Sequence, residues 1–173
     1  TTKKYIMDKD KKDLFYLDEL SDYKVADDYA DIRGWNLKDV DGRVIGEIDD
    51  FLVSKRAERV VYLDVEVDDS IIEKGHDVYG APSSGIHEFL NKDGENHLII
   101  PIGMVTISRD RKEVMTTNIN HETFAKTKRF AKGYAIDQDY ELGTYKNYYS
   151  GDGDDALVVY DENFYNRKGF GKL

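Results

Sequence analysis

Four histidines are the first candidates for chemistry in this sequence: His76, His87, His97 and His121. They are separated by 11, 10 and 24 residues, so no pair has the i, i+4 spacing that presents two imidazoles from one helix to a metal ion. The chain has no cysteine, which excludes disulfides, thiolate catalysis and thiolate metal sites. We interpret His76 and His87 as solvated residues of one long loop. The sequence therefore predicts no metal site and no cofactor.

Acidic side chains offer two further candidates. Asp49 and Asp50 are adjacent, and on a regular strand adjacent side chains point to opposite faces, so the two do not form an acid pair by themselves. The acidic run at residues 152–155 suggests calcium, but a standard calcium loop needs Gly at its sixth position and Glu at its twelfth. Leu157 and Asn163 stand at those positions. We interpret this run as a solvated linker.

Nucleophilic and phosphate-binding motifs are also missing from the sequence. Ser83 and Ser84 lack the G-x-S-x-G elbow, and no phosphate-binding glycine loop lies between an expected strand and helix. We therefore assign no catalytic residue and predict that the protein is not an enzyme.

The elements that would position any site are mostly strands. Asp41 and Gly42 lie between two apolar runs, and Asp-Gly supplies the positive φ of a tight hairpin, so we predict a positive φ at Gly42. Residues 60–67 mostly alternate, with an explicit period of two over 61–67, which predicts one face of this strand in a core and the other in water. The core face would hold Val61, Leu63, Val65 and Val67, and the solvated face Tyr62, Asp64 and Glu66.

Further strands are expected at 97–102, 105–108 and 113–116, which together indicate a mainly β, small antiparallel barrel or sandwich. The intervening stretch 68–96 is expected to be a flexible loop. Asn118 or Asn120 can cap a helix to residue 128, and Asp137 can cap a second one to about residue 149. The termini, including the tail after residue 156, are expected to be loosely ordered.

Composition limits the possible partners. Lys and Arg number 25 against 35 for Asp and Glu, and this net charge of −10 argues against nucleic acid. The longest apolar stretch, 98–107, is interrupted by Pro101 and Gly103 and is too short for a membrane span. We therefore expect a cytoplasmic protein with no integral membrane segment.

The middle of the chain contains a series of short motifs: D-I-R-G at 31–34, D-G at 41–42, G-E-I-D-D at 46–50, Y-L-D-V at 62–65 and L-I-I-P-I-G at 98–103. These motifs resemble the PRC-barrel family, which takes its name from the H subunit of the photosynthetic reaction centre. The resemblance covers residues 13–149 and implies a PRC-type β-barrel over 27–118, after an extension at 1–26 and before a helical extension and tail at 119–173. The positions that we take as structural are Gly34, Trp35, Asp41, Gly42, Gly46, Asp49 and Pro101.

The family resemblance implies a protein-interaction or assembly module. We expect the partner to be another protein or a second copy of the chain, and we expect a homo-oligomer that uses sheet edges or the helix bearing Tyr145, Tyr148 and Tyr149, because tyrosine is favoured at interfaces. Two alternatives remain open. One is a small-molecule or metal-binding protein that uses the 68–96 loop, and the other is a peripheral accessory of a membrane electron-transfer complex.

Overall fold

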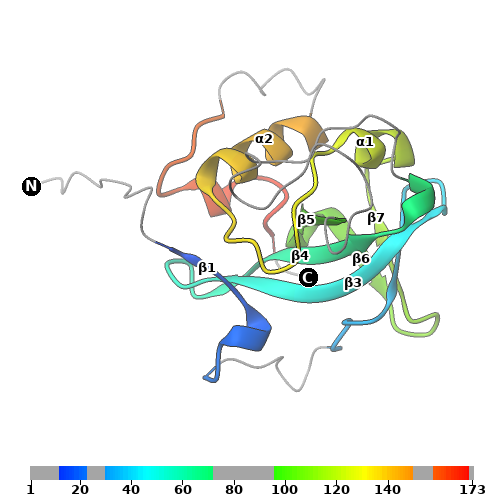
Figure 1. Cartoon of the computed structure of the whole chain (residues 1–173), viewed down its shortest axis with the longest axis horizontal. Coiled ribbons are helices and arrows are strands. Elements are labelled where there is room, and N and C mark those ends of the chain that lie inside the picture. Colours follow the sequence, from blue (N-terminus) through cyan, green and yellow to red (C-terminus); the bar gives the residue numbers. More distant parts are fainter. Residues whose placement is uncertain (1–11, 23–29, 72–95, 150–157, 172–173) are drawn as a thin grey trace, which may run out of the picture.

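Seven strands form one sheet in the computed structural model, which describes residues 12–22, 30–71, 96–149 and 158–171. The strand order is β5-β4-β3-β2-β7-β6, and β1 pairs with β3 off this path (Figure 1). Two α-helices, α1 (His121–Lys126) and α2 (Gln138–Tyr148), follow the last strand. The strands are β1 (Leu14–Tyr16), β2 (Asn36–Lys38), β3 (Val44–Ser54), β4 (Arg59–Val67), β5 (His97–Pro101), β6 (Val105–Ser108) and β7 (Glu113–Thr116).

The β2–β3 hairpin turns where the Asp-Gly pair predicted it. Gly42 has a φ of +87°, which confirms the expected backbone conformation. The preceding Asp39 organises the turn, since its Oδ1 accepts the backbone N–H groups of Asp41 at 3.0 Å and Arg43 at 2.8 Å. A short polar side chain that binds the backbone in this way is the usual means of fixing such a turn.

The structure is mainly β, as expected, but its sheet is neither fully antiparallel nor closed into a barrel. β2 and β7 run parallel, with Leu37 opposite Val114, and no pairing joins β5 to β6. The physical reason lies at the β5 edge, where other groups already occupy the outward backbone positions. His97 exchanges two backbone hydrogen bonds with Phe130, of 3.1 and 2.8 Å, and so blocks closure there.

One face of the sheet curls around the main core. Leu37, Ile48, Leu63, Ile100 and Val114 come from five strands and share one buried cluster, which a flat sheet could not achieve. Phe51 and Val65 belong to the same cluster, and Trp35 packs against it in a partly buried position.

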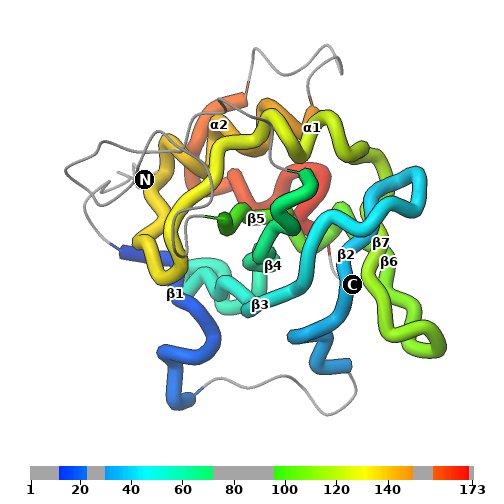
Figure 2. Tube along the Cα trace, turned by 45° about the vertical axis from the view of Figure 1, so that its right-hand side comes forward, coloured from blue at the N-terminus to red at the C-terminus, as the bar shows by residue number. Residues whose placement is uncertain are grey.

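The opposite face of β4 is the first correction to the sequence predictions. Tyr62 and Asp64 were assigned to a solvated face, yet their exposed fractions are 0% and 1%. A second buried cluster covers this face, and Val61, predicted for the main core, belongs to it. Much of the cover comes from side chains of α2 and of the last described segment, residues 158–171. Figure 2 shows the backbone of both segments on the same side of β4 and β5.

The C-terminal segment is the second correction, because residues 158–171 are packed and not loosely ordered. A 3₁₀ helix spans Phe164–Asn166, and Phe164 and Phe170 are 0% and 1% exposed. Arg59 on β4 fixes this segment by donating from Nη1 to the Phe170 carbonyl at 2.7 Å and from Nη2 to the Tyr165 carbonyl. The alternation of β4 could not reveal this cover, since the covering residues lie about a hundred positions away in sequence.

Candidate functional site

The two ends of the sheet differ in how their outer edges are satisfied. At β5, Tyr148 of α2 donates its hydroxyl to the Ile99 carbonyl at 2.7 Å, two residues beyond the bridge between His97 and Phe130. Alternate residues of an edge strand direct their backbone groups outward, so His97 has partners for both of its outward groups and Ile99 has one for its carbonyl. The β5 edge is therefore largely satisfied within the chain.

The β6 edge is open among the described residues, because β6 pairs only with β7. Thr117 N–H donates to the Met104 carbonyl at 3.0 Å just beyond the Val105–Thr116 pair, which makes that pair a non-hydrogen-bonded one. By alternation, the backbone groups of Val105 and Ile107 point away from β7. Figure 2 shows the β6–β7 hairpin at the rim of the molecule. The strand reads V-T-I-S and has no charge or proline that would discourage pairing.

A shallow hollow of about 420 Å³ lies on the outer face beside this edge. Val40 lines the hollow with an exposed fraction of 44%, and Val44, across the hairpin turn, is 39% exposed. They are two of the three large apolar side chains that are exposed in the described part of the chain. The other lining residues are Thr106, Ser108, Arg111, Glu113, Met115, Thr116 and Thr117. We call the β6 edge together with this hollow the edge surface.

The electrostatics of the edge surface differ from those of the whole chain. Lys38 Nζ lies 2.7 Å from Glu113 Oε2, and Arg111 Nη1 lies 3.6 Å from Glu113 Oε1. The hydrogen bond from Lys38 holds the pKa of the Glu113 carboxyl below its usual value. Residues 36–44 and 105–116 together contain the basic Lys38, Arg43, Arg109, Arg111 and Lys112 and the acidic Asp39, Asp41, Asp110 and Glu113, so they are nearly neutral in a chain of net charge −10.

The tyrosines proposed for an interface lie largely inside the chain. Tyr145 and Tyr148 are 5% and 8% exposed, and Tyr149 packs against both buried clusters. Tyr145 donates its hydroxyl to the Lys168 carbonyl at 2.8 Å. These contacts hold α2 on the sheet and on the C-terminal segment, and they leave little of Tyr145 or Tyr148 for a second molecule.

The structural motif positions have local roles. The Gly34 N–H donates to the Ile48 carbonyl at 2.7 Å, and Gly34 has a φ of +89°. At Gly46 a Cβ would lie 2.1 Å from the Glu66 carbonyl oxygen, so only glycine permits the close approach of β3 and β4. Pro101 ends β5 opposite Tyr62. Asp41 is exposed in the turn beside Gly42, and Asp49 lies within an irregularity of β3.

Two groups of side chains in the described residues have the composition of a metal site. The first is Asp39, Asp41 and His121, but both oxygens of Asp39 already accept backbone N–H groups, including that of His121 at 2.8 Å. The second is Asp49, Asp64 and His97. His76, His87 and the 68–96 loop, apart from residues 68–71 and 96, lie outside the described residues.

Sequence reasoning missed several buried acids, among them Asp64 and Glu141. Burial raises the pKa of the Asp64 carboxyl, against the opposing effect of its hydrogen bond with His97. Burial likewise raises the pKa of Glu141 to about 8, although Tyr165 and Tyr62 donate hydroxyl hydrogen bonds to its Oε1. The signal that could have revealed Glu141 was its position four residues before Tyr145, which places both on one side of α2.

No protein-family model matches this chain, and no curated protein is significantly similar to it. In the parts of the chain that the structure describes, no helix combines the length and the apolar character needed to cross a membrane.

Proposed function

We propose that this chain is a non-enzymatic protein-interaction module of the PRC-barrel type that assembles with a second copy of itself. The PRC-barrel assignment rests on the sequence motifs alone, since the structure is mainly β but its sheet is not closed into a barrel. The observation that carries the assembly is the uncharged β6 edge, which lacks a strand partner on its outer side among the described residues.

The proposed contact pairs β6 of one copy antiparallel with β6 of the other across a twofold axis. Such an arrangement is isologous, so each outward hydrogen bond occurs twice. The exposed Val40, which lines the hollow together with Thr106 and Ser108 of β6, would contribute apolar area near the joined edge. Two chains of net charge −10 repel one another, and a nearly neutral edge surface adds little to that repulsion at the contact.

The test is sedimentation equilibrium of the purified chain at several protein concentrations and at two salt concentrations. We expect a dimer that tightens as salt rises, because salt screens the repulsion between acidic chains. Replacing Ile107 with proline removes one outward N–H from each copy and spares the ladder to β7. The loss of two hydrogen bonds should weaken the dimer on the order of a hundredfold.

Ile107→Val is the matched control, since it keeps both the N–H group and the β-branched side chain. If Ile107→Pro fails to fold by circular dichroism, Thr106→Asp adds two like charges at the exposed face of the same contact and should also yield monomers. A monomer under every condition would remove the proposal. A dimer that is unaffected by both substitutions would place the interface elsewhere.

A further inference from the structure

Three neighbouring strands bring Asp49, Asp64 and His97 together. Asp64 lies in the middle of β4, and His97 is the first residue of β5. The strand register pairs Asp64 with Asp50 on β3, and an irregularity between Ile48 and Asp50 inserts Asp49 as an extra residue. The regular alternation that would have sent Asp49 away from Asp50 is therefore interrupted, and Asp49 comes close to Asp64.

The geometry of the cluster is compact. His97 Nδ1 lies 2.8 Å from Asp64 Oδ1, and one ligand atom from each of the three residues lies within 4.8 Å of the other two. An ion bound at about 2.0–2.2 Å from nitrogen and oxygen ligands needs them to converge on this scale. The side chain of Asp49 is 22% exposed, which leaves it room to adjust.

The Oδ2 atom of Asp64 is evidence for a ligand that does not depend on the residue types in the cluster. Asp64 is 1% exposed, and its Oδ2 is buried without a hydrogen-bond partner among the described residues. Leaving a buried carboxylate oxygen without a partner is costly, and native structures rarely tolerate one without a compensating contact. His97 satisfies only the other oxygen.

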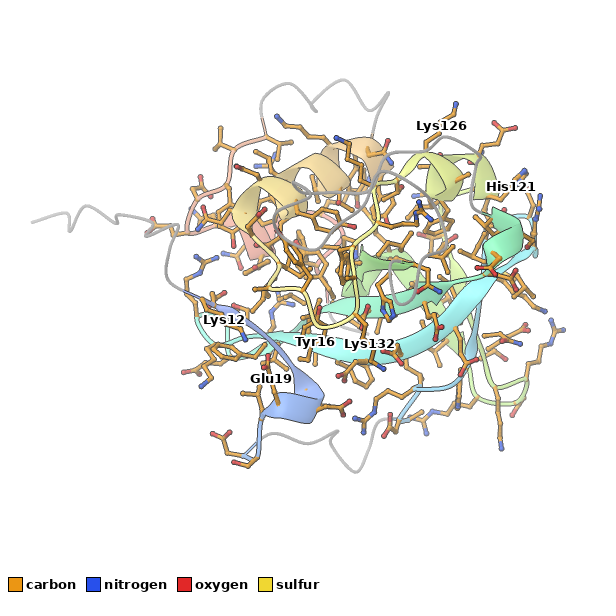
Figure 3. All side chains as sticks on the ribbon, in the orientation of Figure 1. Lys12, Tyr16, Glu19, His121, Lys126 and Lys132 are labelled. Atoms are coloured by element: carbon orange, nitrogen blue, oxygen red, sulfur yellow. The ribbon has the colours of Figure 1, made fainter. Side chains whose placement is uncertain are left out.

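The surrounding charges also favour a cation. Lys132 lies on the segment between α1 and α2 (Figure 3). Its Nζ is 3.1 Å from Asp49 Oδ2 and its side chain is 66% exposed, so the ammonium group contacts the cluster from the solvent. The cluster holds two carboxyl groups, and Lys132 pairs with only one of them, that of Asp49. A divalent cation would contact both carboxyl groups and would displace Lys132 into water.

We propose that Asp49, Asp64 and His97 bind one divalent transition-metal ion. The ligand set of one imidazole nitrogen and two carboxylates suits Zn²⁺, Mn²⁺ or Fe²⁺, because imidazole disfavours Ca²⁺ and Mg²⁺, which take oxygen ligands. Two backbone hydrogen bonds between His97 and Phe130 fix the main chain of His97, from which the imidazole extends. The site lies on β3, β4 and β5, away from the edge surface on β6 and β7, so it neither requires nor excludes assembly.

The direct test is isothermal titration of the purified chain with Zn²⁺, accompanied by Co²⁺ titration, whose visible absorption reports the ligand field. We expect one ion per chain. Asp49→Asn, at the partly exposed ligand, and His97→Gln should each weaken Zn²⁺ binding on the order of tenfold or more. Lys132→Gln removes the competing ammonium group and should tighten binding several-fold, an effect that a purely structural role for Lys132 does not predict.

His121→Gln is the matched control, since it removes the histidine of the other acid–histidine cluster and should leave the titration unchanged. Circular dichroism checks the fold of every variant, and the exposed Lys132→Gln provides a readout if a buried substitution unfolds the chain. An absence of stoichiometric Zn²⁺ and Co²⁺ binding would overturn the proposal. Binding that persists unchanged in both Asp49→Asn and His97→Gln would overturn it equally.

Discussion

At the scale of single residues, the most consequential group is Glu141, an acid that is 2% exposed and lies among tyrosine side chains. Tyr62 and Tyr165 donate hydroxyl hydrogen bonds to Oε1, but burial dominates and raises the pKa of Glu141 to about 8. The folded chain therefore keeps this proton up to about pH 8, whereas an unfolded glutamate loses it near its ordinary pKa of 4.5.

This difference predicts how the free energy of unfolding depends on pH. Between pH 4.5 and about 8 only the folded state holds the proton of Glu141, so this residue lowers stability as pH rises through that window and adds no further change above it. Across this window the free energy of unfolding falls by at most on the order of 5 kcal/mol through Glu141. Glu141→Gln mimics the protonated acid and should lose much less stability between pH 5 and 9. Parallel urea denaturation profiles for the two proteins would contradict the prediction.

At the scale of elements, α2 closes one edge of the sheet. Tyr148 lies on this helix and donates to the Ile99 carbonyl of β5 at 2.7 Å in a buried position. Asp137 starts the helix by accepting the Tyr140 N–H at 2.8 Å, so the cap fixes where the helix begins and hence where Tyr148 lies. At this point of the β5 edge, a helix side chain supplies the hydrogen-bond donor that a further strand would otherwise supply.

Tyr148→Phe should lower the free energy of unfolding by about 1–2 kcal/mol, because it leaves the buried Ile99 carbonyl without this donor. Tyr145→Phe makes the same chemical change on the same helix, but its acceptor, the Lys168 carbonyl, is only partly buried and can turn to water. We expect a smaller loss there, measured by urea unfolding. An equal or larger loss at Tyr145 would show that closure of the β5 edge contributes little.

The sequence predicted local features better than long-range ones. Asp41-Gly42 indicated the hairpin, and Asn120 and Asp137 stand at the helix starts where capping residues were expected, because these signals act over four residues or fewer. The burial of Asp64 depends on a distant covering segment, and its contact with Asp49 depends on a strand irregularity that leaves no sequence mark. The acid–histidine cluster could therefore not be predicted from spacing.

At the scale of the whole molecule, two cores share one sheet, and the second depends on residues 158–171. Phe164 is fully buried in it, so Phe164→Ala should lower the free energy of unfolding by about 3–5 kcal/mol. Val159, in the same segment, is 56% exposed, and Val159→Ala should change the free energy of unfolding by less than about 0.5 kcal/mol. Urea denaturation midpoints of the two variants measure both changes. If Phe164→Ala shifts the midpoint as little as Val159→Ala does, the segment packs only loosely on β4.

The bonds from Arg59 to the carbonyls of Tyr165 and Phe170 span 106 and 111 positions of the chain. At translation rates of 5–20 residues per second, roughly 5 to 22 seconds separate the synthesis of these partners. During that interval the outer face of β4 around Tyr62 lacks the part of its cover that residues 158–171 supply, and this part of the face is accessible to chaperones. The first core can form co-translationally, whereas the second can close only after Phe170 has left the ribosome.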